Sequence, residues 1–214
     1  MKLPVMMLGS GGHAKVLLDI LRRLEVDILG VADPAKRQGD SWLDLPVLGG
    51  DEVVADYGSE DIALINGLGS LPRDAGTRSR LFETFAERGY RFGHVVDPTC
   101  FLAGSVELAA GVQIMAGAII QAGTHIAENT IVNSGAIVEH DCVIGRHVHV
   151  APGAVLSGGV EIGDRTHVGA GAVVIQGIRV GAGSVIGAGS VVTRDVEARQ
   201  IVYPARSQLK NIES

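Results

Sequence analysis

The chain has 214 residues, 46% of them apolar but only 4% aromatic, and 30 glycines, a composition that predicts aliphatic cores and tight turns in two compact domains. Its net charge of −6 excludes a broad positive field, so we expect neither nucleic acid nor an anionic membrane surface as a partner. No apolar run approaches the ~20 residues of a membrane span, and two cysteines are too few for a secreted disulfide scaffold, so a cytoplasmic location is expected.

Residues 1–94 predict a small α/β domain with a Rossmann-like parallel sheet. Strands are expected over residues 5–8, 27–32, 62–66 and 90–96, whereas residues 48–56 are ambiguous. Aliphatic residues fall at helical spacing between residues 16 and 24, and residues 78–88 read as an amphipathic helix. This alternation of strands and helices is typical of a parallel sheet.

A glycine-rich segment joins the first strand to the first helix. It reads Gly9-Ser10-Gly11-Gly12-His13-Ala14 and fits G-x-G-x-x-A, in which backbone N–H groups approach a phosphate at the positive end of a helix. Asp33 follows the second strand, where a carboxylate would hold a ribose hydroxyl. Too few residues precede position 95 for a hydride-cofactor domain, so a nucleotide sugar is the favoured ligand, and a glycine turn without a ligand is the alternative.

A six-residue repeat governs the rest of the chain. From residue 96 an aliphatic residue occupies every sixth position, seventeen times without a slip: Val96, Leu102, Leu108, Ile114, Ile120, Ile126, Val132, Val138, Ile144, Val150, Leu156, Ile162, Val168, Val174, Val180, Ile186 and Val192. Three positions later comes a residue that tolerates positive φ, usually glycine, otherwise often Asn129 or Asp141. One corner per hexad builds a triangular coil of eighteen residues. Residues 95–214 therefore predict an all-β parallel β-helix with a short C-terminal tail.

Residues eighteen apart stack on one edge of such a coil, which sorts the histidines. His149 stacks below His167, for which a polar ridge is the simplest interpretation. His140 lies at a corner between Ala122 and Gly158 of the adjacent coils, so nothing bulky crowds it. A histidine placed there suits a general base, and the adjacent Asp141 would fix its tautomer and raise its basicity. An exposed corner histidine without a role is the alternative.

The remaining histidines and the cysteines carry no predicted chemistry. His125 and His147 are predicted to be surface residues, and His94 a linker residue. Cys100 and Cys142 occupy small inward positions, so we expect core residues rather than nucleophiles.

The two-part layout, the start GSGGHAKV at residues 9–16, NGLGS at residues 66–70 and the segment 133–145 around Glu139-His140-Asp141 resemble the sialic acid O-acetyltransferase family of hexapeptide-repeat transferases. The nearest members are N-acetyltransferases of nucleotide-linked 4-amino-4,6-dideoxy sugars. The resemblance implies a left-handed β-helix, a homotrimer, acetyl-CoA as co-substrate and no metal. It implies direct transfer to GDP-perosamine or a UDP-linked 4-amino sugar, in the biosynthesis of O-antigen or another glycan.

The resemblance also assigns residues. His140 becomes the general base and Asp141 its orienting carboxylate. The residues implied to bind the nucleotide sugar are Gly11, Gly12, His13, Asp33, Gly69 and Asn133. Those implied to bind acetyl-CoA are His149, Gly158, Ala170 and Ala188.

Three other functions stay open at this point. Within the same family, a sialic acid or sugar O-acetyltransferase would use the same base on a hydroxyl acceptor. A γ-class carbonic anhydrase also uses a β-helix, with three histidines around zinc, but this chain lacks a His-x4-His pair. A non-catalytic trimer that only binds a nucleotide sugar is the third.

Overall fold

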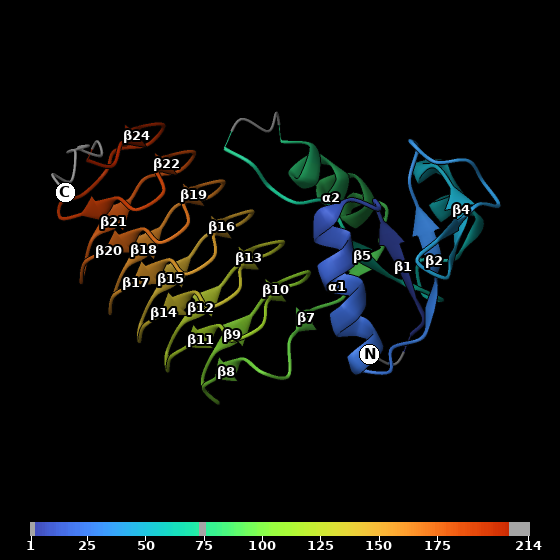
Figure 1. Ribbon diagram of the computed structural model, residues 1–214, viewed down its shortest axis with the longest axis horizontal. Helices are drawn as coiled ribbons and strands as arrows, with labels where there is room; N and C mark the ends of the chain where they lie inside the picture. Colours follow the sequence, from blue (N-terminus) through green and yellow to red (C-terminus); the bar gives the residue numbers. More distant parts are fainter. Residues whose placement is uncertain (1–2, 73–75, 206–214) are drawn as a thin grey trace, which may run out of the picture.

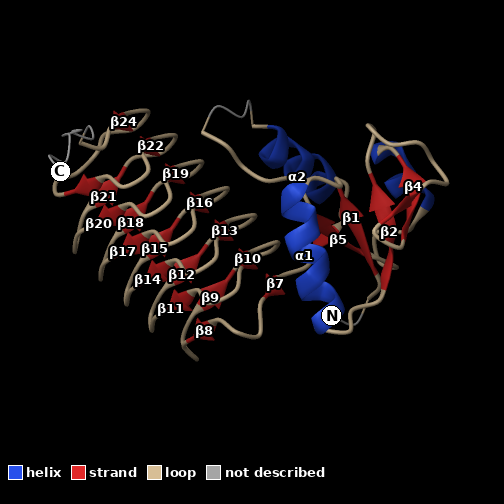
Figure 2. Cartoon of the chain, viewed as in Figure 1, coloured by secondary structure: helices blue, strands red, loops and turns tan. Residues whose placement is uncertain are grey.

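The computed structural model describes residues 3–72 and 76–205. Its N-terminal part is a six-stranded sheet in the order β3-β4-β2-β1-β5-β6, parallel except for the β3–β4 hairpin (Figures 1 and 2). The strands are β1 (Val5–Leu8), β2 (Ile28–Ala32), β3 (Ser41–Trp42), β4 (Leu45–Gly49), β5 (Ala63–Asn66) and β6 (Arg91–Phe92). The helices are α1 (Gly12–Arg23), α2 (Thr77–Glu87) and the 3₁₀ helix η1 (Asp51–Asp56).

The predicted α/β architecture is confirmed, with local differences, among them the β3–β4 hairpin, which was not predicted. The ambiguous residues 48–56 are the end of β4 followed by η1, which lacks the length of a full helix. The single strand expected over residues 90–96 is two strands, because the chain leaves β6 and pairs again with the repeat region through β7 (Val95–Val96).

The repeat region is a three-sided prism of two-residue strands (Figure 1). Its domain-side face consists of β7, β10 (Gln113–Ile114), β13 (Ile131–Val132), β16 (His149–Val150), β19 (His167–Val168), β22 (Val185–Ile186) and β24 (Ile201–Val202). Its apolar face consists of β8 (Phe101–Leu102), β11 (Ile119–Ile120), β14 (Ile137–Val138), β17 (Val155–Leu156), β20 (Val173–Val174) and β23 (Val191–Val192). Its charged face consists of β9 (Glu107–Leu108), β12 (His125–Ile126), β15 (Val143–Ile144), β18 (Glu161–Ile162) and β21 (Arg179–Val180).

The hexad explains this shape residue by residue. The repeating aliphatic is the second residue of each strand, and its side chain points into one continuous core. The predicted corner residues have positive φ, including Gly135 at 63°, Asn129 at 55° and Asp141 at 57°. Cys142 is buried in this core and Cys100 packs against it, as predicted.

Helix α1 lies between the N-terminal sheet and the prism (Figure 1). Its Leu17 and Leu21 share one apolar cluster with Met115 and Ile131 of the prism. At the edge of this contact, Arg23 forms an ion pair with the fully buried Asp97 at 2.5 Å. A continuous interface of this kind holds the N-terminal region in one place on the prism, against the early coils of the domain-side face.

Candidate functional site

His140 lies on the edge between the apolar and charged faces, hereafter the His140 edge. Its ring is 57% exposed, and its Nδ1 is 2.8 Å from Oδ2 of Asp141. The Asp141 carboxylate accepts a hydrogen bond, so Nδ1 carries the proton and Nε2 keeps a free lone pair. The edge therefore presents an accessible basic nitrogen, which is the feature that a general base requires.

Gly158 follows one coil above on the same edge and faces this ring. A Cβ at position 158 would stand 2.6 Å from Nε2 and 2.7 Å from Cε1 of His140. Any other residue would displace the imidazole, because real Cβ atoms essentially never approach other heavy atoms within 3.0 Å. The position of Gly158 thus fits a direct role in seating the base.

A second group of predicted residues gathers where β1, β2 and β5 end. Helix α1 begins at Gly12 after Gly11, and a Cβ on either glycine would meet nothing within 4 Å, so this backbone is open to a ligand. Asp33 accepts hydrogen bonds from the backbone N–H and hydroxyl of Ser10 and from the N–H of Ala35. Although partial burial opposes them, these bonds hold the pKa of Asp33 below its usual range. A cavity of about 650 Å³ adjoins Asp33.

His13 belongs to this loop and its ring faces the prism, and Gly69 lies next to His13. A Cβ on Gly69 would be 3.5 Å from the Cβ of His13. The His13 Nε2 is 2.7 Å from Oε1 of Gln113 in β10. Burial, with a smaller contribution from Arg78, lowers the pKa of His13 to about 4, so the ring is neutral at pH 7. In this structure His13 links helix α1 to the prism.

Asn133 and His149 form a separate pair on the domain-side face. The Nδ1 of His149 is 2.9 Å from the carbonyl oxygen of Ser70, so it donates that hydrogen bond and Nε2 is left to accept one from Nδ2 of Asn133 at 3.1 Å. The ring of His167 meets that of His149 edge-on at 4.9 Å. Burial first, and His167 second, lower the pKa of His149 to about 4.

The remaining predicted residues, Ala170 and Ala188, occupy successive corners between the domain-side and apolar faces, hereafter the alanine edge. Within one chain the predicted residues therefore form three groups: the glycine loop, the alanine edge with the Asn133–His149 pair beside it, and the His140 edge across the apolar face. The structure does not bring His140 next to the other two groups.

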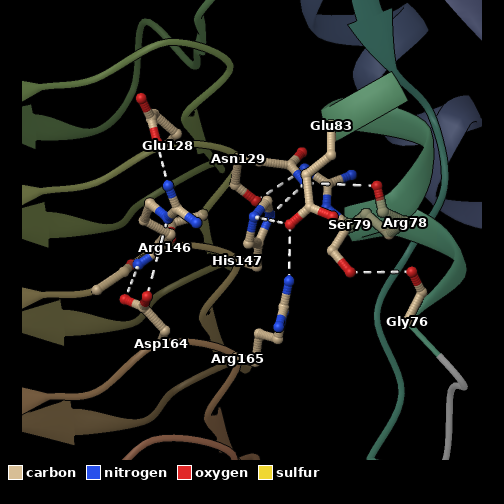
Figure 3. Close-up of polar contacts among 12 residues, drawn as sticks. Gly76, Arg78, Ser79, Glu83, Glu128, Asn129, Arg146, His147, Asp164 and Arg165 are labelled. Carbon is tan, nitrogen blue, oxygen red and sulfur yellow. Dashed lines mark hydrogen bonds and ion pairs between the residues drawn. The ribbon is translucent and has the colours of Figure 1, made fainter. Parts of the chain in front are cut away.

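Two interactions were not foreseen in the sequence. The prediction that His147 is a surface residue is wrong: its side chain is only 5% exposed and lies 3.2 Å from Glu83 of α2, because the domain covers this corner (Figure 3). Ser70 contacts the prism through its carbonyl, which sequence cannot reveal. Among the described residues, no group of three or more His, Cys, Asp or Glu side chains is placed to hold a metal ion.

Comparisons with known proteins match both parts of the chain. The PglD N-terminal domain matches residues 4–85, the bacterial transferase hexapeptide repeat residues 123–158, and the hexapeptide repeat of succinyl-transferase residues 159–194. No curated protein sequence matches the chain. PerB from Caulobacter crescentus, solved with CoA and GDP-perosamine, is 33% identical with a TM-score of 0.85, over 94% of each chain.

Two further solved structures cover nearly the whole chain. The acetyltransferase domain of PglB from Neisseria gonorrhoeae, solved with acetyl coenzyme A, is 30% identical with a TM-score of 0.85, over 96% of this chain and 98% of that one. A histidine-to-alanine variant of the Caulobacter crescentus GDP-perosamine N-acetyltransferase, again with CoA and GDP-perosamine, is 32% identical with a TM-score of 0.86, over 98% and 99%.

The stacked hexads and the accessible histidine–aspartate pair define a left-handed β-helix acyltransferase of the hexapeptide-repeat class. The match of residues 4–85 to the PglD N-terminal domain, and the 33% identity with PerB over 94% of each chain, narrow the class to a family. The chain belongs to the family of acetyl-CoA-dependent nucleotide-sugar N-acetyltransferases.

Proposed function

We propose that this enzyme moves the acetyl group of acetyl-CoA to the amino group of a nucleotide-linked 4-amino-4,6-dideoxy sugar, with His140 as general base. The observation that carries the proposal is the exposed His140–Asp141 pair, seated against Gly158 on an open edge. The relative solved with GDP-perosamine makes a GDP-linked sugar the first candidate, and a UDP-linked 4-amino sugar the second.

The chemistry follows from the geometry of that pair. The sugar amine attacks the thioester carbonyl, a C–N bond forms, and Nε2 of His140 accepts the proton that the amine loses. Asp141 stabilises the resulting imidazolium through the hydrogen bond to Nδ1. The C–S bond then breaks, and the proton passes from Nε2 to the departing CoA sulfur. No covalent enzyme intermediate is needed.

Residues 1–94 would bind the nucleotide sugar and residues 95–214 would perform the transfer. The open glycines Gly11 and Gly12 at the start of α1 suit a diphosphate, because helix N-termini favour anions. The cavity beside Asp33 would hold the nucleoside. In this structure His13 and Gly69 would shape the loop, since the His13 ring is bonded to Gln113.

A homotrimer would bring the His140 edge of one chain next to the alanine edge and the Asn133–His149 pair of another. The outward residues of the apolar face form one hydrophobic column in register: Phe101, Ile119, Ile137, Val155, Val173 and Val191. Phe101 and Val191 at its two ends are 54% and 61% exposed in the single chain. A contiguous apolar column of this kind marks a protein interface, and a second copy of the chain is the occupant that the fold offers.

Threefold packing on the apolar face has a direct consequence for the site. The His140 edge and the alanine edge flank that face on its two sides, so the His140 edge of one chain would meet the alanine edge of its neighbour. His140 would then face the neighbour's Asn133 and His149, with acetyl-CoA lying along Ala170 and Ala188 between them. Small side chains there leave room for the ligand.

None of the helices among the described residues has the length and hydrophobicity to cross a bilayer. A cytoplasmic location, where acetyl-CoA and nucleotide sugars are available, completes the proposal, and both cysteines are free thiols as expected there.

The test is a thioester-release assay against UDP-, GDP- and dTDP-linked 4-amino sugars, with free sialic acid as the hydroxyl acceptor. We expect release with one amino sugar and a loss of about 100-fold or more in His140→Asn, because a general base contributes about 10²–10⁴-fold. Transfer to sialic acid alone would establish the O-acetyltransferase alternative. No transfer by a folded wild-type trimer would favour the binding protein.

The trimer has its own test in a matched pair of variants. Val173→Glu places a charge in the apolar column, whereas Val143→Glu places the same charge on the charged face, where Val143 is 51% exposed. Light scattering is expected to show a monomer for Val173→Glu and a trimer for Val143→Glu. A trimer in both variants would contradict packing on the apolar face.

A further inference from the structure

His149 is a buried imidazole whose two ring nitrogens both bond to the chain itself. Its Nδ1 lies 2.9 Å from the carbonyl oxygen of Ser70, which can only accept, so Nδ1 must carry the ring proton. Burial, with His167 second, lowers the pKa of His149 to about 4, so the ring is neutral at pH 7 and Nε2 is an acceptor. Neither nitrogen is left to donate a hydrogen bond to a ligand.

The partner of Nε2 is the side-chain amide of Asn133, at 3.1 Å. Because Nε2 accepts, the atom of Asn133 that faces it is the donor nitrogen Nδ2. The other end of the amide agrees with this orientation, since Oδ1 of Asn133 accepts the backbone N–H of Ser134 at 2.8 Å. Both ends of the amide are thus fixed, and the second N–H of Nδ2 has no partner among the described residues.

This chain of hydrogen bonds begins in the N-terminal region. Residues 66–70 lead from the end of β5 to the prism, and they lie against the glycine loop, because a Cβ on Gly67 would stand 2.7 Å from the carbonyl oxygen of Gly9. Ser70 at the end of this segment bonds to the imidazole, and the ring of His167 meets it edge-on at 4.9 Å. The N-terminal region therefore decides which ring nitrogen of a prism histidine carries the proton.

Asn133 and His140 flank the same strand, β14, and so belong to the same coil. In the proposed trimer the threefold axis would run along the prism, so Asn133 of one chain would be level with His140 of its neighbour. The free N–H would then lie beside the thioester that the sugar amine attacks. During that attack an electron pair of the C=O bond moves onto oxygen, and it returns when the C–S bond breaks. A donor aimed at that oxygen lowers the barrier.

We propose that His149 is a positioning residue, which holds the Asn133 amide so that its second N–H donates to the thioester oxygen during transfer. Asn133 is then the catalytic residue of the pair, and the carbonyl of Ser70 keeps His149 in the tautomer that accepts from Asn133. This role rests on the acetyl transfer proposed above. It gives the N-terminal region a task in the transfer step besides binding the nucleotide sugar.

Two substitutions of His149 separate positioning from proton transfer. The nitrogen and oxygen of a glutamine amide are joined through one carbon, as the two ring nitrogens are, so His149→Gln can still donate to Ser70 and accept from Asn133. His149→Leu can do neither. We expect His149→Gln to keep kcat within about threefold of wild type with an unchanged pH–rate profile, and His149→Leu and Asn133→Ala to lose about 10- to 100-fold, as when an oxyanion donor is removed.

His125→Leu is the matched control and should leave kcat unchanged, because His125 is also the first residue of a strand but is 55% exposed on the charged face. Urea unfolding shows whether each variant is folded, and Asn133→Ala keeps the proposal testable if His149→Leu is not. Wild-type kcat in Asn133→Ala, or a His149→Gln variant as inactive as His149→Leu, would overturn the proposal.

The ring proton itself is read by ¹⁵N NMR of histidine-labelled protein, with His149→Gln identifying the signal. We expect His149 to be protonated at Nδ1 only at pH 7. A proton on Nε2, or titration of this ring near its ordinary pKa of about 6.5, would contradict the positioning role. The spectrum needs no substrate, so it decides this assignment even if the proposed sugars are not acetylated.

Discussion

Replacing Gly158 with alanine tests whether the seat of His140 matters for catalysis. The new Cβ would stand 2.6 Å from Nε2, whereas ordinary contact begins at 3.4 Å, so the imidazole must move by about 0.8 Å. A displacement near 1 Å costs on the order of 100-fold in rate, or about 2.7 kcal/mol of transition-state stabilisation. Movement of the ring also weakens its 2.8 Å hydrogen bond to Asp141.

Gly104→Ala is the matched control for this substitution. Gly104 occupies the equivalent corner three coils earlier on the same edge, and a Cβ there would meet nothing within 4 Å. Neither glycine has positive φ, so backbone strain affects neither variant. The free energy of unfolding of each variant is expected to stay within about 0.5 kcal/mol of the wild-type value, as is usual for surface substitutions.

The assay is steady-state acetyl transfer followed by thiol release. We expect kcat to fall about 100-fold in Gly158→Ala and to stay unchanged in Gly104→Ala. Wild-type kcat in Gly158→Ala would refute the reasoning, because it would mean that the position of this ring does not limit the reaction.

Three further predictions concern the base, the domain interface and pH. Asp141→Asn should lower kcat by about tenfold or more without changing the trimer, because the imidazolium loses its carboxylate partner; equal pH–rate profiles for variant and wild type would count against that role. Gly111→Ala should destabilise the chain more than Gly117→Ala in urea unfolding: both have positive φ, at 69° and 67°, but only at Gly111 would a Cβ meet Phe82, at 2.9 Å. The pKa values of His13 and His149 in the folded chain lie near 4, below the value of about 6.5 in the unfolded chain. The unfolded state therefore binds more protons below pH 6.5, so the free energy of unfolding should be highest above pH 6.5 and should fall as the pH is lowered toward 4, by about 3 kcal/mol for each ring. His13→Gln should flatten this fall, and an unchanged slope would contradict the assigned burial.

Much of the fold follows from the sequence because the hexad is a strictly local rule. Each coil repeats one inward aliphatic and one corner, so the register from Val96 to Val192 is enough to place His140 on a corner and Cys142 inside the prism. The glycine loop is equally local, since a strand, Gly11-Gly12 and a helix follow one another in the chain.

Contacts between the two regions could not be predicted in the same way. His147 sits at a corner that is exposed in an isolated prism, and it is buried here only because α2 covers it. The bonds of His13 to Gln113 and of Ser70 to His149 join residues far apart in the sequence.

Mixed trimers test most directly the claim that transfer takes place between the His140 edge of one chain and the alanine edge of the next. His140→Asn removes the base, and Ala188→Trp blocks the alanine edge, so each variant alone should be inactive. Random mixing of equal amounts restores one intact pair of edges at about a quarter of the sites, so the mixture should recover about a quarter of wild-type activity. A mixture as inactive as its two components would show that the site is not shared between chains.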